Sequence, residues 1–178
     1  MAIKKSVFIA ASLDGFIARE DGSIEWLLGI DNPDGDDFGY NEFIKDIDVI
    51  IMGRNTFEIV KSFDKWQYGK IKVIVITSSK YILPEGFNQN VEITNDNPHR
   101  LIERLESEGY KHAYVDGGKT IQSFLREGLI DEITITTIPV ILGSGIPLLG
   151  SIGKQINMTH IKTNVYKNGF VQNSFLCK

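Results

Sequence analysis

Short, nearly unbroken runs of large apolar residues are the main feature of this sequence. Residues 49–52 read Val-Ile-Ile-Met, and residues 71–76 are interrupted only by Lys72. Runs without alternating polar positions are typical of strands that are covered on both faces, as in a parallel or mixed sheet. Residues 6–11 and 113–115 form shorter runs of the same kind. We therefore expect these segments to be buried strands of one sheet.

Helical spacing of apolar residues separates the expected strands. Asn97 and Pro98 supply a cap and a first-turn proline for one helix, and Gly109 ends it. Two more helices are expected from the spacing of two apolar sets, Phe38, Tyr40, Phe43, Ile44 and Ile47, and Ile121, Phe124, Leu125 and Leu129.

The pattern becomes antiparallel toward the end of the chain. Residues 133–138 predict a strand, and residues 160–166 and 170–176 flank the turn Lys167-Asn168-Gly169 as a hairpin. Strands separated by helices and followed by a hairpin predict an α/β fold with a mostly parallel central sheet and an antiparallel C-terminal hairpin. The length suits a single domain over residues 1–178.

Composition narrows the functional classes. The net charge of -4 gives no electrostatic reason to expect nucleic acid. Cys177 is the only cysteine, so no intrachain disulfide is expected and a reducing, cytoplasmic setting is the simplest. The three histidines share no ligand spacing, so no metal site is expected. No apolar stretch is long enough to cross a bilayer, and no membrane partner is expected.

The first candidate site lies where the strand 49–52 ends. Gly53 lets the backbone approach a ligand closely, while Arg54, Asn55 and Thr56 place a guanidinium, an amide and a hydroxyl at the start of a helix. Ligands of open α/β sheets bind at this end of the strands, and such donors suit phosphate. An ordinary strand-to-helix connection, in which Asn55 and Glu58 form a capping pair, explains the same residues.

The second candidate turn follows the strand 71–76. It carries Thr77, Ser78, Ser79 and Lys80, and no Asp or Glu stands there to bind a ribose 2′-hydroxyl. Hydroxyls and a lysine suit a 2′-phosphate, so the chemistry favours NADPH over NADH. A polar strand-to-loop junction is the alternative.

A double glycine marks the third candidate turn. Gly117 and Gly118, followed by Lys119, Thr120 and Ile121, open a helix directly after the strand 113–115. The loop is too short to encircle a triphosphate as an ATP-binding phosphate loop does. A helix start of this kind still exposes N–H groups to a pyrophosphate.

Small residues end the first strand. Ala10 and Ala11 leave room for a flat ring against the backbone, and the turn at Asp14 and Gly15 follows them. Tight packing between neighbouring core elements explains the two alanines equally well.

An acidic connection runs from Trp26 to Gly39. Most of its carboxylates fit a solvated loop or a helix N-terminus. If Asp37 points inward beside Phe38, loss of hydration raises its pKa, and its carboxyl group then holds or protonates a nitrogen heterocycle.

Residues 52–58 resemble the cofactor-binding turn of dihydrofolate reductases. In register with this turn, Asp37 falls where that family has its substrate-holding carboxylate, and Trp26 falls near its active-site tryptophan. The resemblance implies the three-layer dihydrofolate reductase-like fold. It also implies that Ala10, Ala11 and Gly15 lie near the nicotinamide and that residues 117–121 form the second cofactor turn. Asp14 then belongs to a flap over a substrate pocket bordered by Trp26 and Phe38.

Residues 129–132 and 139–149 resemble the reductase domain of bifunctional riboflavin-biosynthesis deaminase-reductases more than any folate reductase. Those enzymes have a basic residue for the substrate phosphate in the helix before the 49–52 strand, where this chain reads Phe43-Ile44-Lys45. The proline-containing segment that follows the tryptophan in dihydrofolate reductases is replaced by Leu27-Leu28-Gly29-Ile30.

The two resemblances imply an NADPH-dependent reductase that transfers a hydride to a pteridine, aminopyrimidine or ribosylamino compound. An activity like that of 5-amino-6-(5-phosphoribosylamino)uracil reductase is the first expectation. Dihydrofolate reduction and a non-catalytic NADPH sensor are alternatives, with an ATP-using transferase as a third. A homodimer is expected by the same resemblance.

Overall fold

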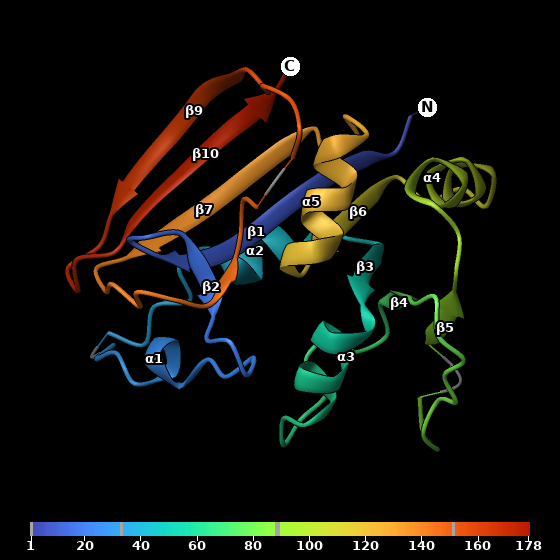
Figure 1. Cartoon of the computed structure of the whole chain (residues 1–178), viewed down its shortest axis with the longest axis horizontal. Coiled ribbons are helices and arrows are strands. Elements are labelled where there is room, and N and C mark those ends of the chain that lie inside the picture. Colours follow the sequence, from blue (N-terminus) through green and yellow to red (C-terminus); the bar gives the residue numbers. More distant parts are fainter. Residues whose placement is uncertain (1, 33, 88–89, 151) are drawn as a thin grey trace.

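An eight-stranded sheet runs through the described part of the protein in the computed structural model (Figure 1). The structure describes residues 2–32, 34–87, 90–150 and 152–178. The strands lie in the order β5-β4-β3-β6-β1-β7-β10-β9. Their bounds are β1 Lys4–Ser12, β3 Val49–Gly53, β4 Lys72–Ile76, β5 Val91–Thr94, β6 His112–Asp116, β7 Glu132–Ile138, β9 Met158–Val165 and β10 Val171–Cys177.

The sheet has the predicted mixture of strand directions. All neighbouring pairs from β5 to β7 are parallel, whereas β10 is antiparallel to both β7 and β9. The prediction of an α/β fold with an antiparallel C-terminal hairpin is therefore confirmed. The central strands β3, β4 and β6 are buried on both faces, which explains their unbroken apolar sequences.

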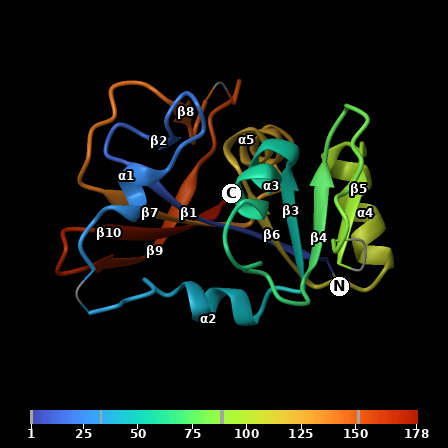
Figure 2. The same ribbon diagram turned by 90° about the horizontal axis from the view of Figure 1, so that it is seen from below.

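Helices cover both faces of the sheet and give three layers. Their bounds are α1 Glu25–Leu28, α2 Tyr40–Lys45, α3 Arg54–Lys61, α4 Pro98–Ser107 and α5 Gly118–Arg126. Leu105 of α4 and Phe124 of α5 are fully buried in one core cluster, and Phe57 of α3 is fully buried in a second. Figure 2 shows α2 and α5 on opposite sides of the sheet. Burying a side chain of this size stabilises the fold by about 1.5–3 kcal/mol.

A second, two-stranded sheet lies over the start of α5. It pairs β2 (Phe16–Ala18) with β8 (Ile146–Pro147) in antiparallel fashion. A side chain on Gly118 would come within 3.0 Å of both Ile17 and Pro147, so the glycine lets this small sheet pack against the helix. The sequence did not predict this sheet.

The helix boundaries confirm one predicted cap and contradict another. The Asn97 side chain accepts a hydrogen bond from the Arg100 N–H (3.0 Å), as expected for the start of α4. The proposed capping pair of Asn55 and Glu58 is wrong, because α3 begins at Arg54 and leaves Asn55 inside the first turn.

Candidate functional site at the carboxyl edge of the sheet

Three parallel strands end side by side at one edge of the sheet. Gly53 at the end of β3 pairs with Ile76 at the end of β4, and Met52 pairs with Asp116 at the end of β6. The neighbour of β6 on its other side is β1. The turns after β3, β4 and β6 therefore meet at this edge, where open α/β sheets bind their ligands, while β1 runs on past it to Ser12.

The starts of α3 and α5 are in direct contact. Gly117 has φ +87°, and a Cβ atom there would lie 2.2 Å from the Thr56 hydroxyl oxygen. A Cβ atom on Gly53 would lie 3.0 Å from the Thr120 hydroxyl oxygen. The first N–H groups of both helices lack partners within their helix and so meet in one place. Together with the exposed Arg54 guanidinium they suit a pyrophosphate.

The turn 77–80 continues this polar surface on the side of β4. Ser78, Ser79 and Lys80 are exposed, and the Thr77 hydroxyl accepts a hydrogen bond from the Ser79 N–H (3.2 Å). The next residue, Tyr81, donates a hydrogen bond from its hydroxyl to Glu58 of α3. The turn is thereby tied to the helix that carries Arg54.

The end of β1 offers only one of its two alanines to a ligand. Ala10 lines a pocket, whereas Ala11 is 2% exposed and lies in the core on the opposite face of the sheet. Successive side chains of a strand point to opposite faces, so the Ala11 side chain does not face this pocket, and a nicotinamide contact by Ala10 stays a prediction.

Asp14 connects the turn after β1 to the loop 139–145. Its carboxylate accepts hydrogen bonds from the Ser12 hydroxyl (2.7 Å), the Leu142 N–H (3.1 Å) and the Gly143 N–H (2.8 Å). The bond from Ser12 and the two N–H groups lower the pKa of Asp14. The turn at Gly15 is held further because its carbonyl accepts the Leu148 N–H.

Replacing Asp14 with alanine should release the loop 139–145 from the turn. We expect amide hydrogen exchange of Leu142 and Gly143 to become at least about tenfold faster, because both N–H groups lose their acceptor. Hydrogen exchange followed by mass spectrometry measures this. Asp21→Ala, which removes another exposed turn carboxylate, is the control and should leave the loop unchanged. Unchanged exchange in Asp14→Ala would show that the carboxylate does not hold the loop.

The inner pocket, of about 320 Å³, lies over β1 and β7 and under α1. Its walls are mostly apolar and come from Phe8, Ala10, Leu27, Phe38, Thr136 and Ile138. Trp26 packs behind Ile138 and Phe38, and its indole N–H is buried and has no hydrogen-bond partner among the described residues. An apolar pocket of this size with few polar groups suits a flat heterocycle.

Asp37 borders the inner pocket but is not buried. Its two carboxylate oxygens accept the N–H groups of Gly39 (2.9 Å) and Asn41 (2.8 Å) at the start of α2. These bonds, that from Asn41 first, lower the pKa of Asp37, so the expectation that burial raises it is wrong. Each oxygen keeps a further lone pair, and the ionised group remains an acceptor for a ligand N–H.

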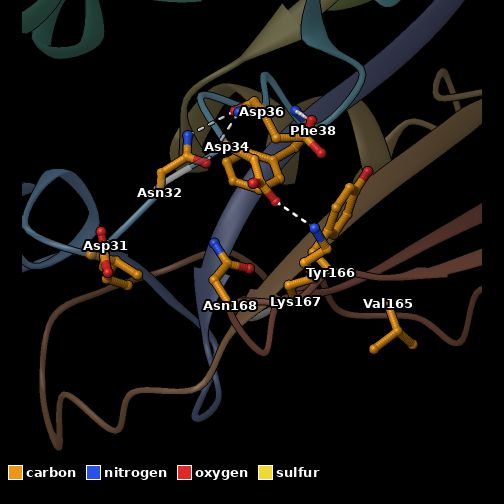
Figure 3. A pocket seen from close by; sticks show the side chains of 10 residues that line it. Asp31, Asn32, Asp34, Asp36, Phe38, Val165, Tyr166, Lys167 and Asn168 are labelled. Carbon is orange, nitrogen blue, oxygen red and sulfur yellow. Dashed lines mark hydrogen bonds and ion pairs between the residues drawn. The ribbon is translucent and has the colours of Figure 1, made fainter.

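Phe38 lies between the inner pocket and a second pocket, called the outer pocket, and lines both. The residue has φ +55°, which is uncommon for a side chain of its size, and its carbonyl accepts a hydrogen bond from buried Gln172 (2.9 Å). Gln172 also donates to the Thr136 hydroxyl (3.0 Å). The outer pocket has a volume of about 530 Å³ and lies between residues 30–32, 34, 36 and 38 of the acidic connection and the hairpin turn at residues 165–168 (Figure 3).

The comparisons with known proteins fit this geometry. Residues 6–172 match the family described as RibD C-terminal domain. The chain belongs to this family. It is 37% identical to the uncharacterized protein YwjB of Bacillus subtilis over 89% of each chain. It is also 30% identical to YyaP of the same organism, over 92% of this chain and 89% of YyaP.

Solved structures of RibD-related proteins have the same architecture. A putative riboflavin biosynthesis protein from Shewanella sp. PV-4 matches with a TM-score of 0.93 and 37% identity over 99% of each chain. The deaminase/reductase of Thermotoga maritima matches with a TM-score of 0.75 and 12% identity, over 99% of this chain and 57% of that one. The dihydrofolate reductase-like fold is therefore confirmed for this RibD C-terminal domain.

One predicted residue of this RibD-type domain, Ile121, is placed differently from the prediction, whereas a cofactor contact by Gly118 stays a prediction. Ile121 is fully buried in the core, and its N–H is donated to the Gly117 carbonyl (2.9 Å), so none of its donors remains for a cofactor. Gly118 makes room for β2 and β8, as described above. The exposed Lys119 and the hydroxyl of buried Thr120 remain at the start of α5.

Asp116 was missed as a site residue. It ends β6, is half-buried, and accepts the Gly117 N–H (2.8 Å). Burial raises the pKa of Asp116 to about 6, a value at which a carboxyl group exchanges protons near neutral pH. Its charge adds to the burial that raises the pKa of three nearby tyrosines, Tyr40, Tyr68 and Tyr114. Tyr114 donates its hydroxyl to the carbonyl of Phe8, a wall of the inner pocket (2.9 Å).

In residues 2–32, 34–87, 90–150 and 152–178, no group of three His, Cys, Asp or Glu is placed to hold a metal ion. No helix within those same ranges has the length and apolar character needed to cross a membrane.

Proposed function

We propose that this RibD C-terminal domain is an NADPH-dependent reductase that transfers a hydride to a flat nitrogen heterocycle. The observation that carries the proposal is the meeting of three phosphate-suited turns beside the apolar inner pocket. Family membership supports an oxidoreductase of the riboflavin-biosynthesis type. The acceptor is then a pteridine, an aminopyrimidine or a ribosylamino compound, and the riboflavin-type aminopyrimidine is favoured over dihydrofolate.

The residues at the carboxyl edge fit this cofactor. Because Gly117 has no Cβ, the backbone at the start of α5 can lie close to the start of α3 and to a bound phosphate group. The N–H groups of α3 and α5 with Arg54 would hold the pyrophosphate, and residues 77–80 would hold the 2′-phosphate. The cofactor, when bound, supplies the hydride from its nicotinamide.

The side chains of the protein would position the hydride acceptor and exchange a proton with solvent. Phe8, Ala10 and Ile138 form an apolar surface against which a ring lies flat and excludes water. Asp37, which remains ionised, would accept hydrogen bonds from amino or ring N–H groups and fix the orientation of the ring. Asp116 is the carboxyl group whose pKa allows proton exchange near neutral pH. Tyr114 lies between this carboxyl group and Phe8, and its hydroxyl donates a hydrogen bond to the Phe8 carbonyl.

Cofactor preference provides the test. We expect NADPH to bind more tightly than NADH. Lys80→Ala should weaken NADPH binding about 3–10-fold and leave NADH unchanged, because only NADPH carries the 2′-phosphate. Fluorescence titration measures both affinities. Lys111→Ala removes an exposed lysine before β6, at the opposite edge of the sheet, and serves as the control.

Turnover separates an enzyme from a sensor. NADPH oxidation should be seen with at least one pteridine or aminopyrimidine in a panel. Tight NADPH binding without turnover on any of them would instead support a non-catalytic sensor. Absence of dinucleotide binding would contradict the whole proposal.

Homodimer formation stays a prediction. The edge strand β9 exposes Ile161 and Val165, with side chains that are 47% and 74% exposed, and Leu176 of β10 is 45% exposed beside it. An exposed edge with apolar side chains is a surface that a second copy would cover.

A further inference from the structure

The inner and outer pockets adjoin each other. Ile30, Asn32 and Phe38 line both of them, so a substituent that passes Phe38 from a ring in the inner pocket would enter the outer pocket. The strained backbone of Phe38 is held by Gln172, and its ring packs edge-on against Tyr166 with centroids 4.9 Å apart. Phe38 is therefore held in place between the two pockets, and the outer pocket is where the tail of a substrate bound in the inner pocket would lie.

The outer pocket carries an excess of negative charge. Asp31, Asp34 and Asp36 all line it, and Lys167 is the only cationic side chain among its lining residues that the structure describes. The Lys167 ammonium is already paired with the Asp34 carboxylate at 2.9 Å, as the dashed line in Figure 3 shows. The ionised Asp37 adds a further carboxylate at the rim of the inner pocket.

The adjacent helix α2 does not compensate this charge. Lys45, its basic residue, is in the last turn, and its ammonium is bonded to Glu42 at 2.6 Å. The other end of α2, nearest the pocket, carries the Asp37 carboxylate, whose oxygens already accept the helix N–H groups. A phosphate in the outer pocket would thus meet carboxylates without a free cation from either neighbouring element.

We infer that the substrate has a tail without phosphate or carboxylate groups: it is a nitrogen heterocycle with a hydroxylated, neutral or cationic substituent. This inference rests on the proposed function and names the substrate class of the same site. The carboxylates accept hydrogen bonds from hydroxyl groups and attract ammonium groups, and the amides of Asn32 and Asn168 can both donate hydrogen bonds to hydroxyl groups and accept them. The same carboxylates repel the phosphate of a phosphoribosyl tail and the carboxylates of dihydrofolate.

A matched pair of ligands tests the inference. The probes are 5-amino-6-(ribosylamino)uracil and its 5-phosphate ester, titrated by calorimetry without cofactor. We expect the unphosphorylated probe to bind at least about tenfold more tightly. Repulsion by several nearby carboxylates weakens the binding free energy of a divalent anion by on the order of 1 kcal/mol or more. The ratio of the two affinities, unphosphorylated probe over phosphate ester, should fall as salt is added, because salt screens charges.

Variants of the acidic loop identify the cause. The triple variant Asp31→Asn, Asp34→Asn, Asp36→Asn keeps an acceptor oxygen for the Phe38 N–H and should reduce the ratio to below about threefold. Lys167→Gln removes the cation that is paired with Asp34 and should increase the ratio. A control with three exposed carboxylates neutralised elsewhere (Asp64→Asn, Glu85→Gln, Glu103→Gln) should leave it unchanged.

Three results would overturn the inference: equal or tighter binding of the phosphate ester, a ratio that is unchanged in the triple variant, or no binding of either probe. NADPH affinity in the same samples reports on the proposed function separately. A protein that binds NADPH and reduces the phosphate ester keeps its reductase function and refutes the inference. A protein that prefers the unphosphorylated probe but binds no NADPH keeps the inference about the pocket and refutes the reductase.

Discussion

Gly117→Ala is expected to lower the free energy of unfolding by about 2–4 kcal/mol and to weaken NADPH binding at least about tenfold. Two effects add at this position. The backbone has φ +87°, and the new Cβ would lie 2.2 Å from the Thr56 hydroxyl oxygen, which real atoms do not tolerate. Relief of that contact has to move the start of α5 away from α3. Chemical denaturation and dinucleotide titration measure the two effects.

Two variants separate backbone strain from the clash. Gly109 has a similar φ of +92° but no atom within 4 Å of an added Cβ. Gly109→Ala should therefore lower the free energy of unfolding by only about 1 kcal/mol. Thr56→Ala removes the hydroxyl and should restore part of the lost stability when combined with Gly117→Ala. If Gly117→Ala costs no more than Gly109→Ala, the close contact between the two helix starts is not rigid and the proposed pyrophosphate site loses its support.

Asp116→Asn should stabilise the protein at neutral pH while reducing turnover. Burial raises the Asp116 pKa from 3.8 to about 6, so the folded protein binds this proton more tightly than the unfolded chain. As the pH rises from about 4 to about 6, the carboxyl group must ionise in the folded state. The shift corresponds to a loss of about 3 kcal/mol of stability over that interval. Asparagine keeps an acceptor for the Gly117 N–H but does not ionise.

The difference in unfolding free energy between Asp116→Asn and the parent protein should therefore be small near pH 4 and grow toward pH 7. Comparison of the two proteins cancels the opposite contribution of Asp14 and Asp37, whose lowered pKa values stabilise the fold above their pKa and lose that effect in acid. Denaturation at several pH values checks this. A pH-independent difference would show that Asp116 is hydrated, and it would then have no special role in proton exchange.

Much of the fold was predictable because burial on both faces leaves a direct mark on a strand. The runs at residues 49–52 and 113–115 have no polar position because helices cover both sides of the sheet. The small sheet of β2 and β8 was not predictable, since strands of three and two residues have no measurable period. Its existence depends on contacts with Gly118 that the sequence does not reveal.

The candidate site was predictable to a similar degree. The turns at Gly53 and Gly117 were expected to meet because adjacent parallel strands end at the same edge. The orientation of Asp37 was not predictable, because α2 begins at Tyr40 and its free N–H groups turn the carboxylate outward. Asp116 was overlooked because an aspartate before two glycines reads as a turn. Its place at the end of a strand with Tyr114 two residues earlier was the available signal.

The position of β1 in the sheet constrains the order in which the protein can acquire its structure. Lys4 pairs with His112 and Ser12 pairs with Ile138, so the N-terminal strand has to wait for partners from the second half of the chain. Pairings so distant in sequence close large loops and slow folding. During synthesis the first strand leaves the ribosome long before β6 and β7, and its apolar residues remain open to aggregation or chaperones until both arrive.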